Sequence, residues 1–285
     1  MRLTLAIIAA ATFAAAPAAA QDAPSVGPPP ANDGIPEVGD TITIGAGIVY
    51  LPDYEGSDDY RFIPAAAFRA EFGDIQIQSR GLRLYADVVP DSDTGLGFTA
   101  GPIAGVRFGR GGNIEDPLVD QLPENDTAIE LGGFAGLTYK GLTNPYDSLT
   151  ARVDVTRDVA GAHDSFIVTS AIDFSTPLSL RSFVSLGASM DVVGDGYADA
   201  YFDVPDLGPT FAPSLTPFDA EGGVKSYSIS LIGAYALGPD IRRGFAVFGL
   251  VSRSQLLGDF ADSPIVSEAG SAEQWVTGLG IGYSF

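Results

Sequence analysis

The chain contains the stretch Leu149-Thr150-Ala151-Arg152-Val153-Asp154-Val155-Thr156, in which apolar and polar residues alternate without interruption. Successive side chains of a β-strand point to opposite faces, so this stretch predicts a strand with one apolar face and one face that carries charge. A soluble β-sandwich shows the same alternation with its polar face outside. A membrane barrel inverts the arrangement, with lipid outside and a polar lumen inside. Alternation alone does not separate these two folds.

The same two-residue period recurs along the chain from Thr41 onward. It predicts strands at residues 41–50, 60–70, 73–79, 81–89, 95–109, 128–140, 147–157, 164–174, 180–190, 223–237, 241–254 and 272–285. The short hairpin that reverses near Ser79–Gly81 is the weakest of these elements. We include it because an even strand number is typical of outer-membrane barrels; ten strands is the alternative count.

The connections between these strands alternate in length. Long ones are expected at 51–59, 111–127, 158–163, 191–222 and 255–271, and short ones at 71–72, 90–94, 141–146, 175–179 and 238–240. Outer-membrane barrels have long extracellular loops and short periplasmic turns. The pattern therefore favours an all-β fold: a transmembrane antiparallel β-barrel of about 12 strands, formed by residues 39–285 and located in the cell outer membrane.

The two ends of the chain agree with an outer-membrane destination. Arg2, the apolar run from Leu3 to Phe13 and the small residues Ala18–Ala20 predict a signal peptide over residues 1–20. Residues 21–38 are rich in Pro and Gly and predict a disordered periplasmic lead-in. The chain closes on GLGIGYSF, residues 278–285, which places Tyr283 and Phe285 on one strand face. We interpret these two aromatic residues as an assembly signal, because such endings resemble the one that the outer-membrane assembly machinery recognises.

Composition excludes several kinds of function. The chain has 36 acidic and 15 basic residues, a net charge of −21, so phosphate would be repelled and nucleic acid is not an expected partner. It has no Cys and one His, His163, which leaves no thiolate or multi-histidine metal site. Ser165 lies too close in sequence to His163 for an ordinary nucleophile and base. We therefore expect no enzyme activity and no cofactor, and we expect His163 to hydrogen-bond across the barrel rim.

Two sets of charged residues deserve separate interpretations. The loops 51–59, 111–127, 191–222 and 255–271 carry many Asp and Glu but no Lys or Arg. They predict a solvated acidic rim, with binding of Ca²⁺ or Mg²⁺ as the alternative. Arg152 and Asp154 are candidate lumen charges, because an Arg that faces lipid at mid-membrane costs about 2–4 kcal/mol. Twelve strands lie between filled barrels of about 8 and open channels of about 16–18, so conduction stays open.

Four stretches are informative when taken together: GIVYLPDYEGS at 47–57, GYADAYFDV at 196–204, LLGDFADSPIV at 256–266 and GLGIGYSF at 278–285. Together they resemble the MltA-interacting protein/OmpV (MipA/OmpV) family of outer-membrane proteins. The resemblance covers nearly the whole chain from about residue 40, and the Ser-Pro-Ile-Val and Tyr-Phe segments are its more specific parts.

The resemblance implies a barrel without enzymatic activity that serves as a scaffold and has a link to the murein-synthesising machinery. The implied partners are outer-membrane lipid and lipopolysaccharide, the assembly machinery and periplasmic murein enzymes. A narrow channel for small solutes or ions is the alternative function.

Overall fold

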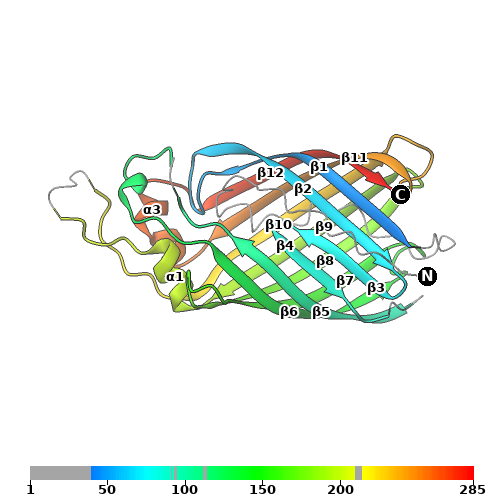
Figure 1. Ribbon diagram of the computed structural model, residues 1–285, viewed down its shortest axis with the longest axis horizontal. Coiled ribbons are helices and arrows are strands. Elements are labelled where there is room, and N and C mark those ends of the chain that lie inside the picture. Colours follow the sequence, from blue (N-terminus) through cyan, green and yellow to red (C-terminus); the bar gives the residue numbers. More distant parts are fainter. Residues whose placement is uncertain (1–39, 91, 93–94, 112–113, 209–213) are drawn as a thin grey trace, which may run out of the picture.

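The strands form one closed antiparallel barrel (Figure 1). The computed structural model describes residues 40–90, 92, 95–111, 114–208 and 214–285. Each strand pairs with its neighbours in chain order, and β12 closes the ring against β1, where Ile44 lies opposite Tyr283 and Ile48 opposite Leu279. Closure pairs both edges of the sheet, which leaves no edge strand exposed to lipid. The predicted fold class and the count of twelve strands are confirmed.

The strand bounds are close to the expected ones. They are β1 Thr41–Pro52, β2 Tyr60–Phe72, β3 Ile75–Arg80, β4 Arg83–Asp87, β5 Gly95–Arg107, β6 Ala128–Lys140, β7 Ser148–Asp158, β8 Phe166–Ser179, β9 Ser182–Val193, β10 Gly223–Ala236, β11 Gly244–Leu256 and β12 Glu273–Ser284.

One predicted turn is wrong. We expected a connection at 175–179, but β8 continues through these residues and pairs with β9 as far as Ser179 opposite Ser182. Ser175, Thr176 and Pro177 have the composition of a turn, and the strand accommodates Pro177 because its register shifts between Pro177 and Ser179. The connection is therefore only Leu180 and Arg181.

Alternation sorts the side chains between the two faces of the barrel wall. In β7, Val153 and Val155 are exposed on the outside, whereas Asp154 and Thr156 are buried inside. In β12, Leu279, Ile281 and Tyr283 are likewise exposed on the outside. Large apolar residues thus cover the exterior, as expected of a wall that faces hydrocarbon.

The two ends of the barrel differ. The long connections and the helices gather at one end, called here the loop end, and the C-terminus of β12 lies toward the opposite, turn end (Figure 1). The helices are α1 Asp195–Phe202, α2 Asp259–Asp262, α3 Pro264–Ser267 and the 3₁₀ turn η2 Val119–Gln121. Among the described residues, no helix has the length and apolar character needed to cross a membrane.

The β3–β4 hairpin is the thinnest part of the wall. Within the described residues, β3 pairs with β2 only between Arg69 and Phe72, and β4 pairs with β5 only over Arg83–Tyr85. The reversal itself lies at Gly81 and Leu82, close to the predicted place. The hairpin therefore reaches only partway along its neighbours.

Two prolines in the flanking strands help to explain this short pairing. The Ser79 hydroxyl bonds both N and O of Phe68, so even-numbered residues of β2, including Pro64, direct their backbone polar groups toward the hairpin. Pro102 of β5 likewise faces β4, because the neighbouring Ala100 accepts the N–H of Val88. A proline has no N–H to donate, so each interrupts the ladder on the hairpin side.

The predicted signal peptide, 1–20, and the predicted lead-in, 21–38, lie outside the described residues.

Candidate functional site

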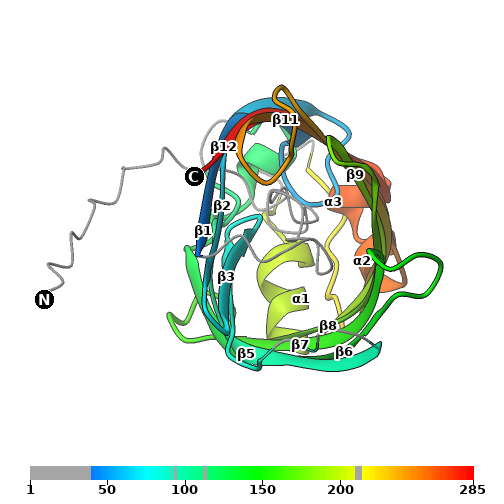
Figure 2. The same ribbon diagram turned by 90° about the vertical axis from the view of Figure 1, so that its right-hand side faces the viewer.

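A buried apolar cluster formed by the loops closes the loop end of the barrel. Its largest members are Tyr54, Tyr197, Tyr201, Phe202, Phe260 and Ile265. They come from the β1–β2 connection, from α1 and from the segment that holds α2 and α3. Figure 2, which looks along the barrel, shows α1 inside the ring of strands. We call this cluster with its loops the plug.

Local sequence explains why α1 fits there. The helix buries Tyr197, Ala198, Tyr201 and Phe202, which recur at the spacing of one helix face. Gly196 sits against the loop that precedes β8, and a Cβ at this position would lie 2.4 Å from the carbonyl oxygen of His163. A side chain there would displace the helix, so close approach requires glycine.

A buried ion pair joins the plug to the barrel wall. Lys225 of β10 is fully buried, and its Nζ lies 2.6 Å from Oε1 of Glu55 and 3.5 Å from Oδ2 of Asp191. The hydroxyl of Tyr197 donates to Oε2 of Glu55 at 2.6 Å. Glu55 therefore contacts a wall strand and a plug helix at once, and these contacts offset the cost of burying its charge.

A second buried group of charges lies around Glu130 of β6. Nε and Nη2 of Arg83 donate to Oε2 of Glu130 at 2.9 and 2.6 Å, and Nε of Arg107 donates to Oε1 at 2.6 Å. Arg107 also donates to the Tyr197 hydroxyl at 3.0 Å. Tyr197 thus links the Glu130 group to the Glu55 group, and the two form one polar layer beneath the plug.

The prediction for His163 is wrong in its position. Its side chain is fully buried and packs against the rings of Tyr197 and Tyr201, with centroid distances of 5.4 and 5.8 Å. Nδ1 accepts the N–H of Ser165, and Nε2 lies 3.9 Å from Oε1 of Glu130. The carboxylate of Asp158 accepts the His163 N–H and folds this loop inward instead of across the rim.

The acidic loops divide into exposed and buried residues. Most of their carboxylates are exposed, as a solvated rim requires, but Asp53 and Glu55 are buried, and Asp53 pairs with Arg61. The prediction of a solvated rim is therefore wrong for Asp53 and Glu55, which are buried under the plug. Only the folded loop brings a cation from a strand to each of them.

Three further carboxylates, those of Asp199, Asp203 and Asp219, have oxygen atoms within 4.8 Å of one another. Burial raises the pKa of Asp203; the N–H of Ala220 opposes this shift, and the charges of Asp199 and Asp219 add to it. Acidic surface groups of this kind are common without an ion, so we infer no metal site.

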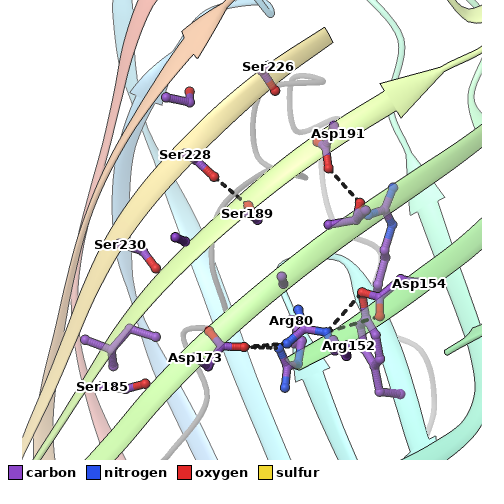
Figure 3. Close-up of a pocket in the computed structure, with 17 residues that line it drawn as sticks. Arg80, Arg152, Asp154, Asp173, Ser185, Ser189, Asp191, Ser226, Ser228 and Ser230 are labelled. Carbon is purple, nitrogen blue, oxygen red and sulfur yellow. Dashed lines mark hydrogen bonds and ion pairs between the residues drawn. The ribbon is translucent and has the colours of Figure 1, made fainter. Parts of the chain in front are cut away.

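A polar cavity lies in the lumen below the charged layer (Figure 3). Arg152 and Asp154 both line it: Nε of Arg152 donates to Asp154 at 3.1 Å, and Nη1 donates to Oδ2 of Asp173 at 2.6 Å. Serine hydroxyls from β9 and β10, the strands that follow β8 in the sheet, continue the polar lining (Figure 3). The side chains of Arg152 and Asp154 thus point into the lumen and are engaged with each other.

Apolar residues fill other parts of the lumen. One cluster contains Phe183, Ala236, Ile241 and Phe248 and lies near the turn end. A second contains Leu51, Ile232 and Leu250, on the side of β1, β10 and β11. The polar cavity therefore occupies only part of the lumen, and it borders the second cluster at Ile232 of β10.

The aromatic residues of the last strand lie on the outer surface at the turn end. Phe285 is 65 % exposed, and its ring centroid lies 4.9 Å from that of Tyr283, which also contacts Phe245 at 4.7 Å. The backbone N–H of Phe285 donates to the carbonyl of Ile42 in β1 at 2.9 Å. Their recognition by the assembly machinery stays a prediction.

Sequence reasoning missed the residues that hold the plug. Lys225 looked like one more polar residue of an alternating strand, and Glu55 like one more loop acid. The available signal was the clustering of Tyr and Phe at 197–202 in a loop expected to be solvated. An exposed loop rarely needs so many large aromatic side chains, and such clustering indicates burial.

Comparisons with known proteins place this chain in a family. No curated protein matches it by sequence. Similar solved structures include an outer membrane channel from Pseudomonas putida F1, 15 % identical, covering 87 % of this chain and 96 % of that chain with a TM-score of 0.43. The outer membrane channel DcaP of Acinetobacter baumannii is 10 % identical, with coverage of 86 % and 96 % and a TM-score of 0.39. The family model of the MltA-interacting protein MipA matches residues 44–285, and the chain therefore belongs to the MipA family.

Proposed function

We propose that the protein is a non-conducting, non-enzymatic barrel of the cell outer membrane that acts as a scaffold for periplasmic murein enzymes. The observation that carries this proposal is the plug, which fills the loop end with packed aromatic side chains and ties them to the wall through Glu55 and Lys225. Packed side chains and a buried ion pair at the loop end leave a solute no open path through the barrel.

The exterior supports a membrane location. Apolar side chains face outward on the strands, and aromatic residues stand near both ends of this surface. Tyr50 contacts both Tyr60 and Phe62 toward the loop end, and Tyr283 contacts both Phe245 and Phe285 at the turn end. Two aromatic girdles around an apolar band are the usual exterior of an outer-membrane barrel.

The name of the family supports the proposed class of partner. The name MltA-interacting protein says that MltA is bound by the protein that gives the family model its name. We extend this to the present chain as binding of a periplasmic murein enzyme at the turn end, which faces the periplasm in the proposed orientation. The 141–147 turn, with Tyr146 exposed, is a suitable place to probe this contact.

Photo-crosslinking in native membranes tests the proposal. A crosslinking amino acid replaces Tyr146 at the turn end or, as the matched control, Asp120 in a loop of the other end. We expect adducts with murein enzymes from position 146 and none from position 120. Adducts from neither position, or equal adducts from both, would contradict the scaffold role.

A narrow channel is the competing function, favoured by the polar cavity that Arg152 and Asp154 line. Planar-bilayer recording separates the two. We expect no reproducible single-channel steps from the purified barrel. Steps whose size changes in Arg152→Ala or Asp154→Ala would establish conduction through this cavity instead.

A further inference from the structure

The lumen cavity combines two kinds of wall that the scaffold role does not use. Arg80, Arg152, Asp154 and Asp173 lie on the side of β3, β7 and β8, and a row of serines lies on β9 and β10 (Figure 3). Few apolar side chains take part. An apolar ligand would leave these polar groups without water or partners, which costs free energy for each group.

The size of the cavity limits what it can hold. Its volume is about 80 Å³, whereas about 10–15 Å³ of space measured in this way is enough to admit one water molecule. The space corresponds to a few water molecules or to an organic molecule with a three- or four-carbon skeleton. The side chains of Arg80 and Asp173 are 21 % and 29 % exposed, so water-sized molecules reach them.

The charges of the wall disfavour an ionic ligand. Three guanidinium groups, of Arg80, Arg83 and Arg152, and three carboxylates, of Asp154, Asp173 and Asp191, line the same space. An anion placed there meets the carboxylates, and a cation meets the guanidinium groups, at distances where like charges repel. A neutral molecule with several hydroxyls can accept from the arginines and donate to the aspartates without this penalty.

Arg80 supplies donors that the protein does not use. A guanidinium carries five N–H donors. Among the described residues, Arg80 makes one ion pair, at 3.7 Å from Nη1 to Oδ2 of Asp173, and its buried Nε has no hydrogen-bond partner. Arg152, by contrast, donates to both Asp154 and Asp173. The Nε of Arg80 is thus an unpaired buried donor, and the accessible part of the same side chain is what can contact a molecule in the cavity.

The serine wall faces these donors with groups that both donate and accept. Ser189 and Ser228 share a hydrogen bond of 2.7 Å, and Ser185, Ser226 and Ser230 continue the row (Figure 3). Hydroxyls can rotate to suit either role. We propose that the cavity is a binding site for a small neutral polyol, which accepts from Arg80 and exchanges hydrogen bonds with Ser228 and Ser230.

Saturation-transfer NMR on the full chain, folded in detergent without glycerol, tests this site. Glycerol and erythritol are the neutral probes, and glycerate and 2-amino-1,3-propanediol are anionic and cationic probes of matched size. We expect saturable binding of the neutral probes and at least tenfold weaker binding of both charged ones.

Variants locate the binding. Arg80→Leu removes charge-assisted donors and is expected to weaken erythritol binding about tenfold or more. Arg181→Leu, at the turn end outside the cavity, is the matched control and should leave binding unchanged. Ser230→Ala is expected to weaken binding about threefold, and it gives an independent measurement if Arg80→Leu does not fold, as judged by heat-modifiable migration.

Two outcomes would overturn the site. One is saturation of the charged probes at concentrations equal to or below those of the neutral ones. The other is neutral-probe binding that is absent in the wild type or is unchanged in both Ser230→Ala and folded Arg80→Leu. The scaffold role is independent of either result, because crosslinking at Tyr146 does not involve the cavity.

Discussion

Lys225 and Glu55 form an ion pair of 2.6 Å inside the barrel although 170 positions separate them in the chain. Lys225 belongs to a wall strand and Glu55 to the first long loop. The pair therefore fixes where the plug sits relative to the wall. Tyr197 donates to the same carboxylate, so α1 is positioned by the same contact.

Replacing Lys225 by Met should loosen the plug. The change leaves Glu55 buried without its cation, which typically costs about 3–5 kcal/mol. We expect protease to cut within 191–222 faster in Lys225→Met than in the wild type in intact cells, while the strands of both proteins stay folded. Arg253→Met, which breaks the exposed pair with Glu273, is the control and should change little. Equal protease resistance of the Lys225 variant and the wild type would contradict the anchoring role.

Asp147 should make the turn at 141–147 sensitive to acid. Burial alone would raise the pKa of Asp147, but the Thr143 hydroxyl and the backbone N–H groups of Leu142, Thr143 and Asn144 bond its carboxylate and lower that pKa overall. A lowered folded-state pKa gives stability that is complete above the unfolded pKa of about 3.9. This stability is lost as the pH falls through the folded pKa.

Asp147→Asn should therefore lower the urea midpoint at pH 7 and have a smaller effect at pH 3. The control is Asp120→Asn, in a loop of the other end, where the carboxylate is exposed. A pH-independent effect of Asp147→Asn would show that the charge of the carboxylate is not what stabilises the turn.

The β3–β4 hairpin should exchange its amide hydrogens faster than the other strands. Its short ladders and the two flanking prolines leave few backbone bonds to break. Pro102→Ala supplies an N–H that faces β4 and should slow exchange there. Pro177→Ala is the matched control, because Pro177 lies in β8, which is not paired with the hairpin, and the change should leave exchange over 75–87 as it is. Exchange over 75–87 as slow as in β6 would contradict this account.

Deleting Phe285 should impair assembly more than stability. The residue contributes one exposed ring beside Tyr283 and one backbone bond to Ile42, so its loss removes little from a folded barrel. We expect less protein in the outer membrane but near-normal heat-modifiable migration of the fraction that inserts. Asp120→Asn should insert normally. Wild-type levels of the truncated protein would show that the terminal Phe is not an assembly signal.

Protease accessibility also checks the orientation of the barrel. Cleavage of wild-type protein in intact cells is expected in the exposed parts of 191–222, whereas 141–146 should be protected until the outer membrane is opened. The reverse pattern would invert the proposed orientation and move the partner-binding end to the cell surface.

The sequence by itself determined the wall of this barrel. Alternation in a segment such as Leu149–Thr156 follows from the geometry of a single strand, and the parity of long and short connections follows from strand order. Both are local properties, so the strand count, the outward face of Tyr283 and the inward face of Asp154 could be predicted without the fold. The end of β8 could not, because a bulge rather than a turn accommodates Pro177.

Only the tertiary structure decided what fills the barrel. Lys225, Glu55 and Tyr197 lie far apart in sequence, and none belongs to a motif that announces their contact. Their meeting depends on barrel closure and on loops that fold inward to bury aromatic residues that lack strand periodicity. The positions of His163 against α1 and of Arg80 beside Asp173 also depend on barrel closure. A side chain in a lumen is positioned by groups from the opposite wall, and a linear pattern contains no information about which residues those are.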